Sequence, residues 1–175
     1  MDIQFYPTPP DLARRAWRKF KTVFKRVLEP SAGNGSLLIN HPFEDVWGRR
    51  GAPPIDCCEI DISKHSTLRG RGFNVVGLDF LRYASGAHYS HIILNPPFTD
   101  GAKHALKAWD LLWDGEIVAI LNAETLLNPF SKERQRLAKL IEKHGEVEFI
   151  ANAFTVQEAQ RKTEVEFAPF NLRKK

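Results

Sequence analysis

The chain has 175 residues, of which 43% are hydrophobic and 26% charged, with a formal net charge of +4 and a pI near 9.1. These values are typical of one soluble globular domain with a sizeable core. No apolar run approaches the ~20 residues that a membrane-spanning helix needs, and the first residues lack the basic and apolar regions of a signal peptide. We therefore expect one domain over residues 1–175, located in the cytoplasm and without a membrane partner.

Segments that favour helices alternate with segments that favour strands. The expected helices are 9–21, 63–69, 100–113, 131–144 and a short one from Ser36 to Asn40 that Pro42 ends. The expected strands are 27–28, 55–59, 74–78, 91–94, 116–121, 146–150 and 163–170. Asp100 and Ser131 are expected to cap the helices that follow them. This alternation predicts an α/β fold with a mostly parallel sheet.

A basic stretch lies between residues 14 and 26, which hold seven Lys or Arg residues and no acid. Such a stretch suits a polyanion, and it is equally what the solvated face of an amphipathic helix looks like. Arg14, Arg15 and Arg18 are its candidates for weak contacts to a nucleic-acid backbone.

A glycine loop, residues 29–35, follows the first expected strand with the sequence Glu-Pro-Ser-Ala-Gly-Asn-Gly. Two glycines at such a place let the backbone turn tightly and approach a ligand. Taken alone, a Gly-x-Gly after a strand is more often a structural turn.

Acidic residues follow the next two expected strands. Glu59 ends the second strand, where an acid in an α/β fold can reach two ribose hydroxyls, and Asp61 is expected to cap the helix after it. Asp79 and Phe80 follow the third strand.

The most specific motif is Asn95-Pro96-Pro97-Phe98, which follows the apolar run His91–Leu94. Two prolines end the ladder of strand hydrogen bonds, so the carbonyls of Asn95 and Pro96 can accept hydrogen bonds from a ligand. The Asn95 side chain adds an acceptor and Phe98 adds a flat apolar face. This combination suits a planar heterocycle with an exocyclic amine, and its structural alternative is a kinked strand end with a buried Phe.

Scattered histidines and adjacent cysteines give no sign of a metal site. The six histidines lack a ligand-like spacing with cysteine, so no metal is expected. Cys57 and Cys58 cannot bridge each other without strain, and we expect them in the core of a protein from a reducing compartment.

Together these motifs, in order from Phe5 to about Leu172, resemble the N6-adenine DNA methyltransferases. They are similar, more loosely, to the wider group that methylates amino nitrogens of RNA bases or protein glutamine. The resemblance implies a Rossmann-like class I methyltransferase fold, with a seven-stranded, mostly parallel sheet and an antiparallel last strand. It implies S-adenosyl-L-methionine as the cofactor.

By this resemblance the cofactor lies along the strand ends. Gly33 approaches its methionine portion, Glu29 orders the loop or the cofactor amine, and Glu59 holds the ribose. Asp79 accepts from the adenine amine and Phe80, which could equally be plain core, packs on the ring. The implied cofactor-binding residues are Tyr6, Thr8, Pro9, Glu29, Pro30, Ser31, Ala32, Gly33, Gly35, Glu59, Ile60, Asp79 and Phe80.

The resemblance also implies the chemistry. Asn95 and Pro96 would accept both hydrogens of the adenine N6 amine, which returns electron density to a nitrogen whose lone pair is delocalised. In double-stranded DNA the base must first flip out of the stack, and Phe98 would then stack on it for ~1–3 kcal/mol. The implied catalytic residues are Asn95, Pro96 and Phe98, with Pro97 and Phe98 binding the substrate.

One departure from the family is that no separate target-recognition domain is evident. The segments 41–54, 122–130 and 151–162 are short, so specificity is either low or supplied by a longer protein or a partner subunit. An RNA base or a protein glutamine as the acceptor, and a non-catalytic nucleic-acid-binding descendant of the fold, remain alternatives.

Overall fold

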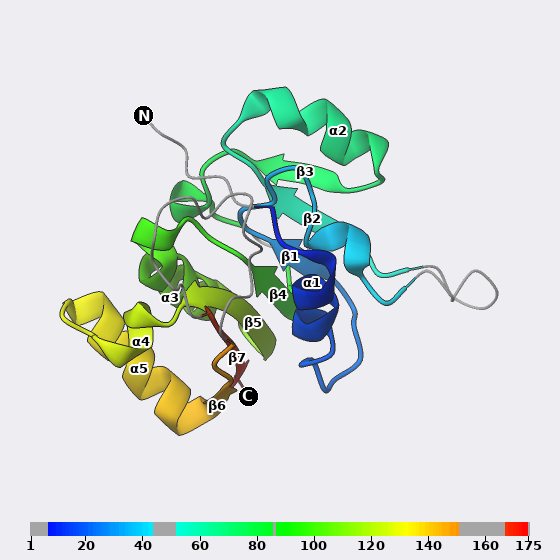
Figure 1. Cartoon of the computed structure of the whole chain (residues 1–175). Coiled ribbons are helices and arrows are strands. Elements are labelled where there is room, and N and C mark those ends of the chain that lie inside the picture. Colours follow the sequence, from blue (N-terminus) through cyan, green and yellow to red (C-terminus); the bar gives the residue numbers. More distant parts are fainter. Residues whose placement is uncertain (1–6, 44–51, 86, 151–166, 175) are drawn as a thin grey trace.

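A central seven-stranded sheet with helices on both faces forms the protein (Figure 1), as seen in a computed structural model that describes residues 7–43, 52–85, 87–150 and 167–174. The strand order is β3-β2-β1-β4-β5-β7-β6. The strands are β1 (Val27–Glu29), β2 (Ile55–Cys58), β3 (Asn74–Gly77), β4 (His91–Leu94), β5 (Gly115–Asn122), β6 (Gly145–Val147) and β7 (Phe167–Lys174). Neighbouring strands from β3 to β5 are parallel, and β7 is antiparallel to β5 and β6. The predicted sheet with its antiparallel last strand is confirmed.

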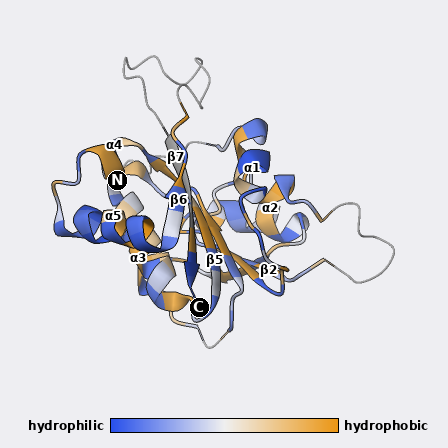
Figure 2. Cartoon of the chain, turned by 90° about the horizontal axis from the view of Figure 1, so that it is seen from below, coloured by the Kyte–Doolittle hydropathy of each residue, from blue (hydrophilic) through white to orange (hydrophobic). Residues whose placement is uncertain are grey.

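The helices form two layers, which Figure 2 shows on opposite sides of the sheet. One layer contains α1 (Pro10–Trp17) and α2 (His65–Gly70), and the other contains α3 (Gly101–Leu111) and α5 (Lys132–His144). Successive strand residues point to alternate faces, so Ile93 packs in the first layer while Ile92 and Leu94 pack in the second. Because both faces are covered, β4 is buried along its whole length.

Several helix boundaries differ from those expected. Residues 36–40 form turns and a short 3-10 helix, η1 (Leu38–Asn40), instead of an α-helix, and the short α4 (Glu124–Leu127) was not predicted. Ser131 caps α5 as predicted, since its Oγ accepts from the Arg134 amide at 3.2 Å. Asp100 occupies the predicted N-cap position of α3, but its side chain makes no capping hydrogen bond and instead pairs with Lys103 Nζ at 3.0 Å.

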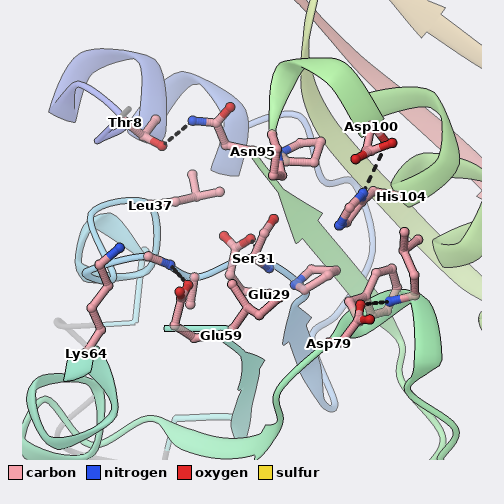
Figure 3. A pocket seen from close by; sticks show the side chains of 18 of the residues that line it. Thr8, Glu29, Ser31, Leu37, Glu59, Lys64, Asp79, Asn95, Asp100 and His104 are labelled. Carbon is pink, nitrogen blue, oxygen red and sulfur yellow. Dashed lines mark hydrogen bonds between the residues drawn. The ribbon is translucent and has the colours of Figure 1, made fainter. Parts of the chain in front are cut away.

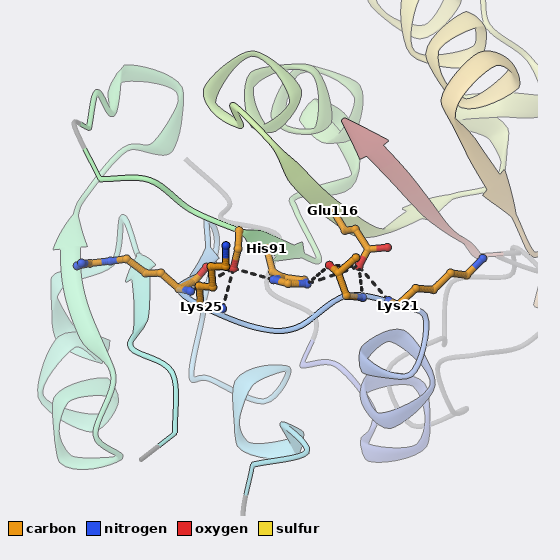
Figure 4. A network of polar contacts seen from close by, with 7 residues as sticks. Lys21, Lys25, His91 and Glu116 are labelled. Atoms are coloured by element: carbon orange, nitrogen blue, oxygen red, sulfur yellow. Dashed lines mark hydrogen bonds and ion pairs between the residues drawn. The ribbon is translucent and has the colours of Figure 1, made fainter. Parts of the chain in front are cut away.

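A buried polar network explains why α1 ends at Trp17, before the expected residue 21 (Figure 4). Glu116 Oε2 accepts from the backbone amides of Lys21 and Thr22, each at 2.9 Å, so these amides are not available to continue the helix. Thr22 Oγ1 also donates to Glu116 at 2.9 Å and lies 3.0 Å from His91 Nε2. His91 and Glu116 are fully buried at the amino ends of β4 and β5, and burial lowers the pKa of His91. The network thus fixes the connection between α1 and β1.

Gly115 should be the glycine least tolerant of substitution. Its φ is +142°, and an added Cβ would lie 2.0 Å from the Ser90 carbonyl oxygen in the neighbouring strand connection. We expect Gly115→Ala to lower the free energy of unfolding by ~3 kcal/mol or more, because a backbone clash adds to conformational strain. Gly72→Ala is the control: its φ is +85° with nothing within 4 Å of the new Cβ, so only ~1 kcal/mol should be lost. Equal losses in urea titrations would contradict the clash.

Candidate functional site

A cavity of about 440 Å³ opens at the carboxyl ends of β1, β2, β3 and β4. The cavity spans the point between β1 and β4 where the strand order reverses. Open α/β sheets bind their ligands at such a point. Its wall is formed by residues from the glycine loop, from the ends of β2, β3 and β4, and from the helices next to them (Figure 3).

Most of the residues predicted to form the site lie in the wall of this one cavity. They are Thr8, Glu29, Pro30, Ser31, Ala32, Gly33, Glu59, Ile60, Asp79, Phe80, Asn95, Pro96, Pro97 and Phe98. Pro9 and Gly35 are not part of the wall: Pro9 is the residue before α1, and Gly35, with a φ of +82°, faces the Leu68 side chain. Tyr6 lies outside the described residues. Their binding roles stay predictions.

Glu59 holds the glycine loop in place. Its side chain is 5% exposed, and Oε2 accepts from the Gly33 amide at 2.6 Å while Oε1 accepts from the Asp61 amide at 2.9 Å. Gly33 has a φ of +56°, a left-handed conformation that glycine adopts without cost. Each carboxylate oxygen has two lone pairs, so Glu59 can still accept from hydroxyls in the cavity. Asp61, as predicted, caps the next turn through the Ser63 amide at 3.0 Å.

Glu29 lies deeper in the cavity wall and is only 1% exposed. Burial, the largest influence, raises its pKa to about 8, and the amides of Ser31 and Asn95, which favour the ionised form, offset this only in part. Oε1 accepts from the Ser31 amide at 3.2 Å, whereas Oε2 is buried and accepts no hydrogen bond from the described residues. A buried acceptor of this kind suits a cationic or N–H group of a ligand.

Asn95 is fixed by Thr8, which precedes α1. Asn95 Nδ2 donates to Thr8 Oγ1 at 3.0 Å, and the Thr8 amide donates to Ser36 Oγ at 2.8 Å. Because the amide nitrogen is held by Thr8, the side-chain oxygen of Asn95 is the atom left to accept from a ligand. Phe98 is half-buried in the cavity wall and packs against the layer that contains α1.

The third strand end combines a capping acid with a core aromatic. Asp79 Oδ1 accepts from the Leu81 amide at 2.9 Å and so caps a short 3-10 helix, η4 (Phe80–Arg82). Phe80 is 2% exposed, belongs to the core and also lines the cavity. Phe80 is therefore a core residue whose side chain reaches the cavity, and its packing on the cofactor ring stays a prediction.

His104 and Lys64 line the cavity and were missed by sequence analysis. His104 is in α3, 8% exposed, with Nδ1 3.0 Å from the Asp100 carbonyl oxygen, and burial lowers its pKa. Helical spacing was the one sequence pattern that could have indicated a buried position for His104. In the expected helix 100–113, this residue lies next to the buried Ala105 and one turn beyond Asp100. A lone His on a buried helix face is not distinctive enough to be chosen from sequence.

The basic stretch 14–26 is largely paired with acids of the same chain. Arg14 pairs with Asp11, Arg15 and Lys19 pair with Glu148, Lys21 pairs with Glu146, and Arg26 pairs with Asp56. Arg18 is exposed directly after α1. These pairs weaken the positive field that the sequence suggested. Within the described residues no group of His, Cys, Asp and Glu could hold a metal ion, and no helix is long and apolar enough to cross a membrane.

Comparison with known proteins identifies the fold. No protein-family model and no curated protein sequence matches the chain, but many solved structures do. A putative class I S-adenosylmethionine-dependent methyltransferase from Listeria monocytogenes has a TM-score of 0.68 at 13% identity, covering 100% of this chain and 63% of that one. A dimethyladenosine transferase from Plasmodium falciparum has a TM-score of 0.66 at 16% identity, covering 98% of this chain and 64% of that one.

A third similar structure is the type I restriction-modification methyltransferase subunit from Streptococcus thermophilus. Its TM-score is 0.69 at 17% identity, covering 98% of this chain but only 45% of that one. At these identities the likeness establishes the fold, which is the Rossmann-like fold of the class I methyltransferases. The chain spans less than two thirds of the length of each of these three neighbours.

Glu29 should make the stability of the protein depend on pH. Its pKa is about 8 in the folded protein against an ordinary 4.5, so between these values the folded protein retains a proton that the unfolded chain has lost. The free energy of unfolding should therefore fall as pH rises from about 4.5 to 8. Urea titrations across this range should show a shallower fall for Glu29→Gln, and no change for the control Glu124→Gln at the exposed start of α4. An unaltered slope in Glu29→Gln would assign the titration to another group.

Proposed function

We propose that the chain binds S-adenosyl-L-methionine and transfers its methyl group to an exocyclic amine, with adenine N6 in DNA as the first candidate acceptor. One observation carries this proposal. The glycine loop, Glu59 and the Asn95-Pro96-Pro97-Phe98 motif come from three different strand ends and line the same cavity. If these three motifs were only a structural turn, a charged strand end and a kinked strand, nothing would require them to line one cavity.

The cofactor half of the cavity is formed by β1, β2 and β3. Glu59 would accept from the ribose hydroxyls while its bond to Gly33 keeps the loop in shape. Glu29 offers a buried acceptor to the cofactor ammonium, and a cation at that point would favour its ionised form. Ile60 and Phe80 line the part of the cavity where the adenine ring would lie, beside Asp79. The bound cofactor supplies a methyl group on a sulfonium, so the protein mainly supplies position and electrostatics.

The acceptor half is formed by the end of β4. The Asn95 side-chain oxygen and the Pro96 carbonyl would accept the two hydrogens of the acceptor amine, which localises the lone pair on nitrogen. Thr8 keeps the Asn95 amide in the required orientation. Phe98 would stack on the base, an interaction of ~1–3 kcal/mol. As the methyl–sulfur bond breaks and the methyl–nitrogen bond forms, a neutral thioether leaves and the nitrogen becomes positive, and the same two acceptors stabilise that charge. The methylated nitrogen then loses one of its protons to water.

DNA is favoured over other acceptors by the motif and by the likeness to a restriction-modification methyltransferase subunit. The likeness to a dimethyladenosine transferase supports adenine as the base, and an RNA base remains an alternative acceptor. A protein glutamine acceptor, or a nucleic-acid-binding protein without catalysis, are the other outcomes. Because the basic stretch is mostly paired internally, we propose that sequence recognition comes from another part of a longer protein or from a separate subunit.

Cofactor binding can be tested with two neighbouring acids. Glu59→Gln keeps the shape but loses the charge and one acceptor of a buried carboxylate, so affinity for S-adenosylhomocysteine should fall by ~10–100-fold. Asp61→Asn is the matched control, since Asp61 lies outside the cavity wall and should leave the affinity within ~2-fold. Isothermal titration calorimetry gives both constants. Equal effects, or no binding by the wild-type protein, would overturn the cofactor assignment.

Methyl transfer should depend on Asn95 far more than cofactor binding does. We expect Asn95→Ala to lower the rate at least ~100-fold, because an acceptor aimed at the reacting amine is lost, while the affinity for S-adenosylhomocysteine stays nearly constant. Thr8→Val removes the bond that orients Asn95 and should lower the rate by ~10-fold.

The assay incubates wild-type protein and variants with labelled cofactor and DNA, RNA or cell extract, followed by nucleoside analysis. N6-methyladenine in DNA supports the first candidate acceptor. Label found only in RNA or only in protein would overturn the DNA acceptor, and cofactor binding without transfer to anything would favour the non-catalytic alternative.

A further inference from the structure

His104 is a buried polar residue of the cavity that the methyl-transfer proposal does not use. It lies on α3, on the side of the cavity where Asp79 is found (Figure 3). Its ring stacks on Phe80 with the ring centroids 5.9 Å apart and the planes at 29°. The side chain is 8% exposed, so its position is set by packing and not by solvent.

The hydrogen bond to Asp100 fixes which nitrogen of His104 carries the proton. Nδ1 is 3.0 Å from the Asp100 backbone oxygen, and a carbonyl oxygen can only accept, so Nδ1 must donate. Burial lowers the pKa of His104, which keeps the ring neutral at pH 7. Nε2 therefore has a free lone pair, and it points away from Asp100 into the cavity (Figure 3).

Such an atom requires a donor from the ligand. A second acceptor, the Asp79 carboxylate, is close enough to influence the titration of His104. Phe80, which stacks on His104, supplies a flat apolar surface in the same cavity wall. Two acceptors beside a flat ring suit the edge of a planar heterocycle that carries an amine. Asn95 and Pro96, which face the acceptor amine in the proposed reaction, belong to a different strand end.

We propose that His104 Nε2 accepts a hydrogen bond from the 6-amino group of the cofactor adenine, and that this bond makes the site prefer an aminopurine to an oxopurine. The inference rests on the proposed cofactor binding. It assigns to His104 the choice of cofactor base and no part in methyl transfer itself.

Calorimetry with two ligands tests this role without any acceptor present. The ligands are S-adenosylhomocysteine and S-inosylhomocysteine, which carries an oxygen acceptor in place of the 6-amino group. The wild-type protein should prefer the adenine compound by ~10–100-fold, because the oxygen would face two acceptors with no donor. In His104→Phe, which keeps a ring on Phe80, this preference should fall at least ~5-fold.

The ratio of the two affinities separates recognition from general damage to the cavity, which would weaken both ligands equally. An unchanged preference in His104→Phe would overturn the role of His104 alone. If His104→Phe keeps the affinity for S-adenosylhomocysteine and the preference for adenine but loses methyl transfer, the proposed role is also overturned, because His104 would then act on the acceptor. If the wild-type protein binds neither compound, the proposed function itself fails.

The pH dependence of the preference gives a second readout. Protonation would turn Nε2 into a donor, which suits the inosine oxygen. Because burial lowers the pKa of His104 from the ordinary 6.5, the preference for adenine in the wild-type protein should decrease only as the pH falls below that value. The charged groups that act on His104 are Asp100 and Lys103 beside it and Asp79, which precedes η4. Glu29 also titrates in the cavity wall, but it affects both ligands alike. In His104→Phe, which has no titratable ring at this position, the preference should stay constant over the same pH range, and a decrease of equal size in this variant would contradict the role of His104.

Discussion

The hydrogen bond between the Glu59 carboxylate and the Gly33 amide connects two of the four strand ends on which the site is built. Glu59 belongs to the end of β2 and Gly33 to the loop after β1, so their 2.6 Å contact closes the loop against its neighbouring strand. A buried carboxylate and a buried backbone amide are each costly when they lack a partner. Together they satisfy each other and give the cavity a floor that exists before any ligand arrives. The preformed floor reduces the ordering that a ligand must bring about on binding.

The rest of the cavity is assembled by the sheet. Parallel strands bring their carboxyl ends to one edge, so residues far apart in sequence, such as Thr8 and Asn95, meet there. The opposite edge is closed by the Glu116 and His91 network, which fixes the start of β1. One edge is thus tied together by internal hydrogen bonds, whereas the other leaves acceptors such as Glu29 Oε2 facing the cavity.

The α/β class could be predicted from the alternation of strands and helices, because apolar runs determine where strands end, whereas the sheet order and most residues of the cavity wall came from the resemblance to a known family. Asn95 and Glu59 each follow such a run directly, so their edge of the sheet was fixed once the strands were assigned. What failed depends on contacts between distant residues. The early end of α1 results from Glu116, more than 90 residues away. Three residues of the basic stretch, Arg15, Lys19 and Lys21, are paired with acids more than 120 residues away. His104 was missed because a buried histidine on a helix looks like a core residue until its cavity is known.

The two adjacent cysteines of β2 lie on opposite faces of the sheet, so each belongs to a different layer of the core. Cys57 and Cys58 are both fully buried, yet the first packs in the layer of α1 and the second in the layer of α3. Burial raises the pKa of each thiol to about 12, so neither forms the reactive thiolate while the sheet is closed. Reaction with a disulfide reagent would require a local opening of one layer. The chain therefore carries two built-in chemical reporters, one for each side of its sheet, through which the opening of the two layers could be timed separately.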